Sequence, residues 1–172
     1  DRPVSGAVLF AKTSKALTRL NEMIREGRIR KIYWALTEQA PDPLSGELCH
    51  YILRDGRANR SRACDAPKAD AKQARLRYAT LGAGTHYTLV EVELLTGRTH
   101  QIRATMADLG CPLLGDGKYG DGRANRRYGE TRQALYSYRL TFDFSTDAGI
   151  LGYLRGRSFQ VDQVPFRDKY FG

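Results

Sequence analysis

The chain has 172 residues, of which 41% are hydrophobic and 27% charged, and this composition excludes a disordered protein. No apolar run approaches the ~20 residues that a membrane-spanning helix needs, and no signal peptide opens the chain, so we expect a cytoplasmic protein without a membrane span. A net charge of +9 favours a polyanionic partner, with nucleic acid first and an acidic membrane surface second. The alternative is a basic surface without a partner.

The first predicted elements are a strand and a helix. A short apolar run at residues 7–11 predicts a buried strand. Thr13 or Ser14 can cap the helix that follows, in which apolar residues recur at helical spacing between positions 16 and 24. Gly27 suits the end of this helix.

No obligate protein partner is indicated.

The stretch RKIYWALTE, residues 30–38, predicts a strand with two different faces. Ile32, Trp34 and Leu36 share one face, so Tyr33 points to the other. Further strands are expected at residues 48–53, 74–81, 87–95 and 134–144, and the polar, basic stretch 54–72 reads as a long excursion or a mobile hairpin. Strands outnumber helices and do not alternate with them, which predicts an α+β domain on a mainly antiparallel sheet with flanking helices.

The most informative stretch is LLTGRTHQIRATMADLG, residues 94–110. Thr99 is expected to cap a helix with an apolar stripe, and Gly110 to end it. A helix start suits anions, so Arg98 and His100 could meet phosphate. Arg103 lies one turn after Thr99 and could pair with a carboxylate. Such a cluster could hold an anion, a metal or a nucleic acid, or could be an ordinary solvated helix start.

Three other kinds of site are poorly supported. The three histidines lack H-x-x-x-H spacing, and the three cysteines form no C-x-x-C pair, so we expect free thiols, no disulfide framework and no metal site. No G-x-S-x-G motif is present, and Cys111 has no evident base, which argues against a hydrolase. The glycine-rich GDGKYGDG lacks the ending of a nucleotide P-loop.

Four segments carry a family resemblance over nearly the whole chain, and it is weakest at residues 54–72. DRPVSGAVLFAK, KIYWAL, LLTGRTHQIRATMADLGCPLLGDGKYG and RQALYSYRLTF occur in this order and with fitting separations. Together they resemble the catalytic domain of RluA-type pseudouridine synthases, most of all the RluC-like branch that acts on large-subunit ribosomal RNA. The resemblance implies an isomerase that converts uridine in RNA to pseudouridine without a cofactor or metal.

The resemblance also implies roles for individual residues. Asp1 matches the nucleophilic aspartate, Tyr33 the tyrosine that stacks on the target uracil, and Arg103 the arginine that pairs with the aspartate. The residues expected to contact RNA are Arg2, Arg98, His100, Gln101, Lys118 and Tyr119.

The family pattern differs at the start of the chain. Pro3 and Val4 replace a polar residue and Thr, and the His-Arg-Leu that precedes the aspartate is absent. We therefore expect residues 1–172 to be a single catalytic domain lacking an upstream segment, which in this family often follows a small S4-type RNA-binding domain. Two alternatives stay open: a synthase acting on transfer RNA, and a non-catalytic RNA-binding or ribosome-assembly protein of the same fold.

Overall fold

A computed structural model describes residues 1, 4–84 and 86–171. Its centre is an eight-stranded sheet in the order β1-β7-β2-β6-β5-β3-β4, with β8 also paired to β7. All pairings are antiparallel except that of β1 with β7, which confirms the predicted α+β class with a mainly antiparallel sheet. The strands are β1 (Ser5–Gly6), β2 (Ile29–Thr37), β3 (Ser45–Asp55), β4 (Arg60–Cys64), β5 (Lys72–Ala83), β6 (Thr88–Leu94), β7 (Leu135–Phe142) and β8 (Ser158–Gln160).

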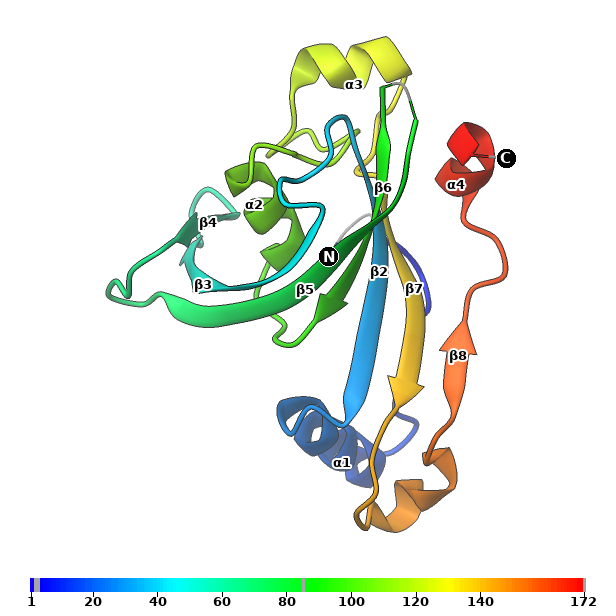
Figure 1. Cartoon of the computed structure of the whole chain (residues 1–172). Coiled ribbons are helices and arrows are strands. Elements are labelled where there is room, and N and C mark those ends of the chain that lie inside the picture. Colours follow the sequence, from blue (N-terminus) through cyan, green and yellow to red (C-terminus); the bar gives the residue numbers. More distant parts are fainter. Residues whose placement is uncertain (2–3, 85, 172) are drawn as a thin grey trace.

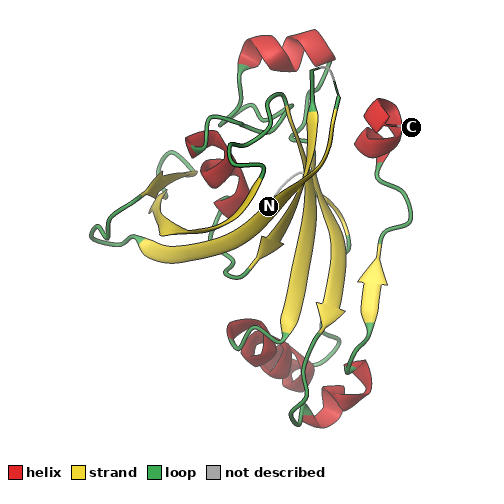
Figure 2. Cartoon of the chain, in the orientation of Figure 1, coloured by secondary structure: helices red, strands yellow, loops and turns green. Residues whose placement is uncertain are grey.

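The helices lie around this sheet, as Figures 1 and 2 show. They are α1 (Ser14–Arg25), α2 (Gln101–Asp108), α3 (Gly122–Tyr128), the 3₁₀ helix η1 (Gly149–Leu154) and α4 (Pro165–Phe171). In Figure 1, α2 sits against the curved part of the sheet, α1 and η1 lie at its lower end, and α3 lies at its upper end. Within the described part of the chain, no helix is both long and apolar enough to cross a membrane.

The main core lies between α2 and the central strands. Ile102 and Met106 of α2 are buried against apolar residues of β2, β5, β6 and β7. The predicted alternation of β2 is confirmed here, because Tyr33 and Ala35 pack into this core whereas Trp34 stacks on Tyr138. The sheet and α2 together therefore fix where Tyr33 and the start of α2 lie.

The opposite end of β2 and β7 is covered by α1 and η1. Thr13 caps α1, as predicted, by accepting a hydrogen bond from the backbone N–H of Ala16 at 3.2 Å. Met23 is fully buried against Phe142 and Leu151. The positive φ of Gly27, 69°, allows the turn into β2.

Three expectations about secondary structure are wrong or incomplete. Residues 7–11 are not a strand, and Val8 and Phe10 are 68% and 83% exposed, because the pairing with β7 stops at Gly6. The stretch 54–72 is a hairpin in which β4 pairs with β3 and contacts α2, so it forms part of the fold. The helices α3 and α4 were not predicted.

Candidate active site

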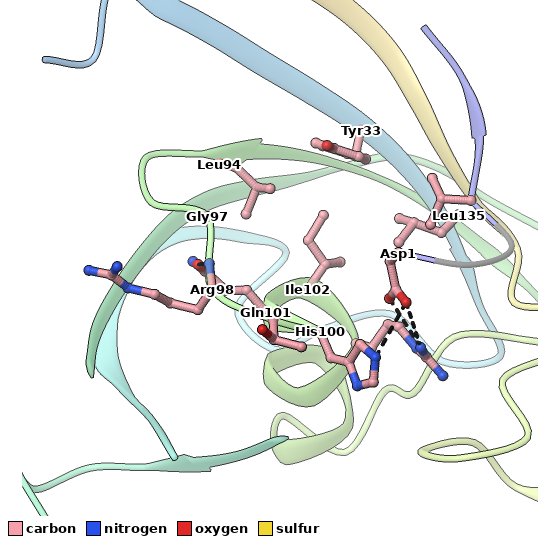
Figure 3. Close-up of a pocket in the computed structure, with 12 residues that line it drawn as sticks. Asp1, Tyr33, Leu94, Gly97, Arg98, His100, Gln101, Ile102 and Leu135 are labelled. Carbon is pink, nitrogen blue, oxygen red and sulfur yellow. Dashed lines mark hydrogen bonds and ion pairs between the residues drawn. The ribbon is translucent and has the colours of Figure 1, made fainter. Parts of the chain in front are cut away.

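A pocket of about 370 Å³ opens between β2, the end of β6 and the start of α2 (Figure 3). Its size lies in the ~300–1,000 Å³ range of small-ligand sites. Residues from five parts of the chain line it: Asp1, Val4, Tyr33, Leu94, Gly97, Arg98, Thr99, His100, Gln101, Ile102, Arg103 and Leu135. The structure therefore brings the three predicted catalytic residues, Asp1, Tyr33 and Arg103, to one pocket.

The loop before α2 is held by Gln101. This side chain is 2% exposed, accepts hydrogen bonds from Thr96 Oγ1 and the Arg98 backbone N–H, and donates one to the Arg75 carbonyl. Its amide therefore holds the loop in place, and the RNA contact of Gln101 stays a prediction. The predicted cap is wrong as well, because the residue before α2 is His100, not Thr99, and no side chain caps this helix.

Arg103 connects two carboxylates in the pocket wall. It is 4% exposed, and its Nε and Nη2 donate to the two oxygens of Asp116 at 2.7 and 2.8 Å. Its Nη1 donates to Asp1 Oδ2 at 3.0 Å. The planar guanidinium makes this possible, because one edge binds a carboxylate through two hydrogen bonds while another donor stays available.

Asp116 is a site residue that sequence reasoning missed. It is fully buried and accepts hydrogen bonds from the backbone N–H groups of Lys118 and Tyr119 besides those from Arg103. Burial disfavours its charged form, yet the hydrogen bonds from Arg103 and the backbone hold the pKa of Asp116 below its usual value. The lone acid within GDGKYG, next to glycines, was the available signal.

His100 joins the same group of residues. Its Nε2 lies 3.3 Å from Asp1 Oδ1, and its Nδ1 lies 2.9 Å from the hydroxyl of Tyr119. Burial, with the charges of Arg103 and Lys118, lowers the pKa of His100 to about 4. The imidazole is therefore neutral at neutral pH, and it lies beside the Asp1 carboxylate as an uncharged group (Figure 3).

Tyr33 supplies an aromatic surface on the β2 side of the pocket (Figure 3). Burial raises the pKa of its phenol, while the hydrogen bond with Ser137 acts against this rise. The phenol is therefore un-ionised at neutral pH. Together with Leu94, Ile102 and Leu135, it gives the pocket an apolar wall opposite the charged one.

The other residues predicted to contact RNA lie in different places. Arg2 is outside the described residues. Arg98 lines the pocket while its Nε donates to the Gln73 carbonyl at 2.8 Å, and Lys118 Nζ donates to the Asn59 carbonyl at 2.7 Å. Tyr119 holds His100 with its hydroxyl.

A second cavity of about 530 Å³ adjoins the first and shares Asp1, His100 and Arg103 with it. Its other lining residues include Lys118 and Arg132, so this cavity is basic. Among the described residues, no group of three or more His, Cys, Asp or Glu side chains could hold a metal ion. The three cysteines are free thiols.

This arrangement is suited to chemistry at an electrophilic carbon. The Asp1 side chain is 22% exposed, so a ligand can reach its carboxylate, and Arg103 favours the ionised form that acts as a nucleophile or base. The aromatic and apolar wall opposite is suited to a flat heterocyclic ring.

Comparison with known proteins identifies the family. A family model described as RNA pseudouridylate synthase matches residues 1–108, and the chain therefore belongs to this family. An uncharacterised RNA pseudouridine synthase of Chloroflexus aurantiacus is 40% identical over 140 residues, covering 81% of this chain and 42% of that protein. The mitochondrial pseudouridylate synthase RPUSD4 of Xenopus tropicalis is 34% identical over 142 residues, covering 69% of this chain and 43% of that protein.

The fold also matches that of a solved structure. Human RNA pseudouridylate synthase domain containing 1 aligns with a TM-score of 0.72 at 24% identity, covering 95% of this chain and 66% of that one. At this identity the match shows the shared fold alone. The chain spans less than half the length of each of the two sequence relatives above.

Proposed function

We propose that the chain is the catalytic part of an RNA pseudouridine synthase, which isomerises uridine to pseudouridine with Asp1 as the nucleophile. The observation that carries this proposal is the Asp1 carboxylate, held 3.0 Å from Nη1 of the buried Arg103 beside the pocket that Tyr33 lines. Membership of the RNA pseudouridylate synthase family supports the same reaction.

Each residue of the pocket has its own role in the proposed reaction. As nucleophile, the Asp1 carboxylate bonds to C1′ of the ribose while the bond between C1′ and N1 breaks, and the Asp1–C1′ bond breaks again when C5 of the uracil bonds to C1′. Arg103 keeps the carboxylate ionised. The freed uracil stays stacked on Tyr33, turns, and bonds to C1′ through C5. The proton on C5 leaves and N1 gains one, so the product is an isomer and no redox partner is consumed.

The target nucleotide must leave its stack to enter this pocket. Enzymes that act on a base generally extrude it, and unpaired loops make this extrusion least costly. The second, basic cavity lies on the other side of Asp1, where Lys118 and Arg132 are suited to the phosphates on either side of the flipped nucleotide. We therefore propose an RNA substrate with an unpaired target uridine.

Large-subunit ribosomal RNA is our first candidate substrate. The resemblance of the chain, its closing ILGYLRGRSFQVDQVPF included, to the RluC-like branch supports it. Transfer RNA is the second candidate, because target choice depends on surface loops and on any segment outside this chain. The grouping of Asp1, Tyr33 and Arg103 in one pocket favours an enzyme over a non-catalytic RNA-binding protein, which would need no such trio.

Tritium release tests both the reaction and the substrate. Large-subunit ribosomal RNA and transfer RNA, each with C5-tritiated uridine, are incubated with the full-length protein and with its Asp1→Asn variant. We expect tritium release from ribosomal RNA by the wild-type protein and none by the variant. Tritium release from transfer RNA alone would contradict ribosomal RNA as the substrate. RNA binding without tritium release from either RNA would contradict the proposed isomerisation.

A further inference from the structure

Four groups beside the pocket form a continuous chain of polar contacts. The backbone N–H of Ser61 donates to the Tyr119 hydroxyl at 2.6 Å. The same hydroxyl lies 2.9 Å from His100 Nδ1, and His100 Nε2 lies 3.3 Å from Asp1 Oδ1. The chain therefore runs from strand β4 to the proposed nucleophile.

The position of each proton in this chain follows from its first member. A backbone N–H can only donate, so the Tyr119 oxygen accepts from Ser61 and has its own proton left to give. The acceptor within reach is His100 Nδ1. A neutral imidazole that accepts at Nδ1 carries its proton on Nε2, the nitrogen that lies 3.3 Å from Asp1 Oδ1.

The other tautomer fits poorly. With the proton on Nδ1, the bare Nε2 would face a carboxylate oxygen at 3.3 Å, so two acceptors would oppose each other. The Tyr119 hydroxyl would accept from both Ser61 and His100, and its own proton would have no acceptor among the described residues. An unmade hydrogen bond in a part-buried site is costly.

We propose that Tyr119 is a positioning residue that selects the Nε2–H tautomer of His100 and so directs an imidazole N–H at the Asp1 carboxylate. The proposal replaces the expected RNA contact of Tyr119, and its catalytic consequence rests on the proposed function. Arg103 and His100 then hold Asp1 from two directions, which limits the orientation of the carboxylate beside the ribose.

The surroundings of Tyr119 agree with a fixed position. The guanidinium carbons of Arg60 and Arg103 lie 5.1 and 5.0 Å from its ring centroid, so cation–π contacts hold the ring. The backbone of His100 has a φ of 54°, an unfavourable value for a residue with a Cβ, and this conformation aims its ring at Asp1. Ser61 also bonds the loop directly, because its Oγ donates to the Thr99 carbonyl at 2.7 Å.

The charged groups around His100 set its pH response. They are the carboxylate of Asp1, together with Arg103, Lys118 and Asp116. Burial and the two cationic side chains lower the pKa of His100 to about 4, so no titration is expected above roughly pH 5. The Tyr119 hydroxyl donates its proton to Nδ1, and this hydrogen bond stabilises the neutral ring. Loss of the hydroxyl therefore raises the pKa of His100.

Nitrogen NMR of histidine tests the proposal directly. The protein, labelled with ¹⁵N-histidine, is compared with Tyr119→Phe between pH 5 and 8, and the His100 signals are assigned by their loss in His100→Gln. We expect the wild type to show the Nε2–H tautomer at every pH, and Tyr119→Phe to show a tautomer mixture with a pKa raised by roughly one unit or more. An Nδ1–H tautomer in the wild type, or an unchanged tautomer in Tyr119→Phe, would overturn the proposal.

Kinetics test the catalytic consequence. Tyr119→Phe is expected to lower kcat roughly tenfold with KM unchanged, since one orienting hydrogen bond is lost. Gln at position 100 offers an amide N–H and has no tautomers, so Tyr119→Phe should have no further effect in the His100→Gln background. Tyr78→Phe, which loses a hydroxyl bonded to the Pro43 carbonyl, is the control and should leave kcat and the His100 tautomer unchanged.

The outcomes separate this proposal from the proposed function. A raised KM with unchanged kcat in Tyr119→Phe would mean an RNA contact and would overturn the positioning role. The NMR measurement needs no RNA. A tautomer change in a protein that releases no tritium from any RNA would therefore support the positioning role and contradict the pseudouridine synthase activity.

Discussion

At the scale of single residues, the site depends on one guanidinium shared between two carboxylates. Asp116 takes two donors of Arg103 and is fully buried, whereas Asp1 takes the third and is partly accessible. A lysine would provide a point charge without this fork. Asp116 therefore orients Arg103, and Arg103 in turn presents a fixed donor to Asp1.

The first prediction concerns Asp116→Asn. Removing the carboxylate leaves a guanidinium that is 4% exposed without its buried counter-charge, so we expect the free energy of unfolding at neutral pH to fall by about 3 kcal/mol. The pKa of Asp116 is lowered in the folded state, so its contribution is complete above the ordinary value of ~3.9 and is lost as the pH falls further. Urea unfolding of the wild type and of Asp116→Asn should show that the difference between their free energies of unfolding becomes smaller in acid.

Glu22→Gln is the matched control for this prediction. It breaks the partly exposed Arg19–Glu22 pair, whose side chains are 27% and 35% exposed, and should cost less than about 1 kcal/mol. Equal losses in the two variants would contradict the view that Asp116 neutralises a buried charge.

At the scale of elements, the start of α2 differs from that of α1. Thr13 caps α1 through its side chain, but no side chain caps α2. The loop that leads into α2 is instead held by Gln101 and by the bond from Ser61 Oγ to the Thr99 carbonyl. This loop places His100 beside Asp1, and the helix α2 lacks an ordinary side-chain N-cap.

The second prediction compares two threonines. Thr13→Ala should lower the free energy of unfolding by about 1 kcal/mol, because the Ala16 N–H loses its acceptor. Thr99→Ala should change it by less than about 0.5 kcal/mol, since no cap hydrogen bond is lost. Denaturant unfolding measures both, and a loss at Thr99 as large as that at Thr13 would show that Thr99 does cap α2.

Sequence patterns predicted the elements whose periodicity is strong and whose contacts are local. The alternation around Tyr33 and the helical spacing after Thr13 are examples, and both are confirmed. The apolar run at residues 7–11 failed because an apolar stretch does not reveal whether a partner strand continues beside it. The left-handed conformation of His100 has no local signal, because glycine or asparagine usually marks it.

The candidate site could also be predicted only in part. Family likeness indicated Asp1, Tyr33 and Arg103, which do share a pocket, although they lie far apart in the sequence. Asp116 and the hydrogen-bonding role of Tyr119 were missed, because they depend on contacts that only the folded loop and the β3–β4 hairpin create.

At the scale of the whole molecule, basic residues gather on α3 near the basic cavity. Arg123, Arg126 and Arg127 are exposed on this helix, which Figure 1 shows at the end of the molecule opposite α1. Lys118, which precedes α3 in the sequence, and Arg132, which follows it, both line the cavity. We therefore expect RNA to extend from the pocket towards α3.

The third prediction follows from this placement. Replacing Arg123, Arg126 and Arg127 by Glu should weaken RNA binding and reduce the slope of log Kd against log salt by about 0.7 for each lost phosphate contact. A control with the same change in net charge, Glu at Lys12, Lys15 and Arg25 of the exposed α1 region, should bind almost as the wild type does. Equal effects of the two triple variants in a salt titration would show that net charge, and not α3, determines affinity.

The central claim is that Asp1 carries out the isomerisation of uridine, and nucleoside analysis tests it most directly. The full-length protein and its Asp1→Asn variant are incubated with large-subunit ribosomal RNA, which is then digested to nucleosides and separated by chromatography. We predict that the wild type produces one pseudouridine for each uridine lost, and that the variant binds the RNA equally well but produces none. Pseudouridine formation by the variant, or RNA binding by the wild type without any conversion, would contradict the account.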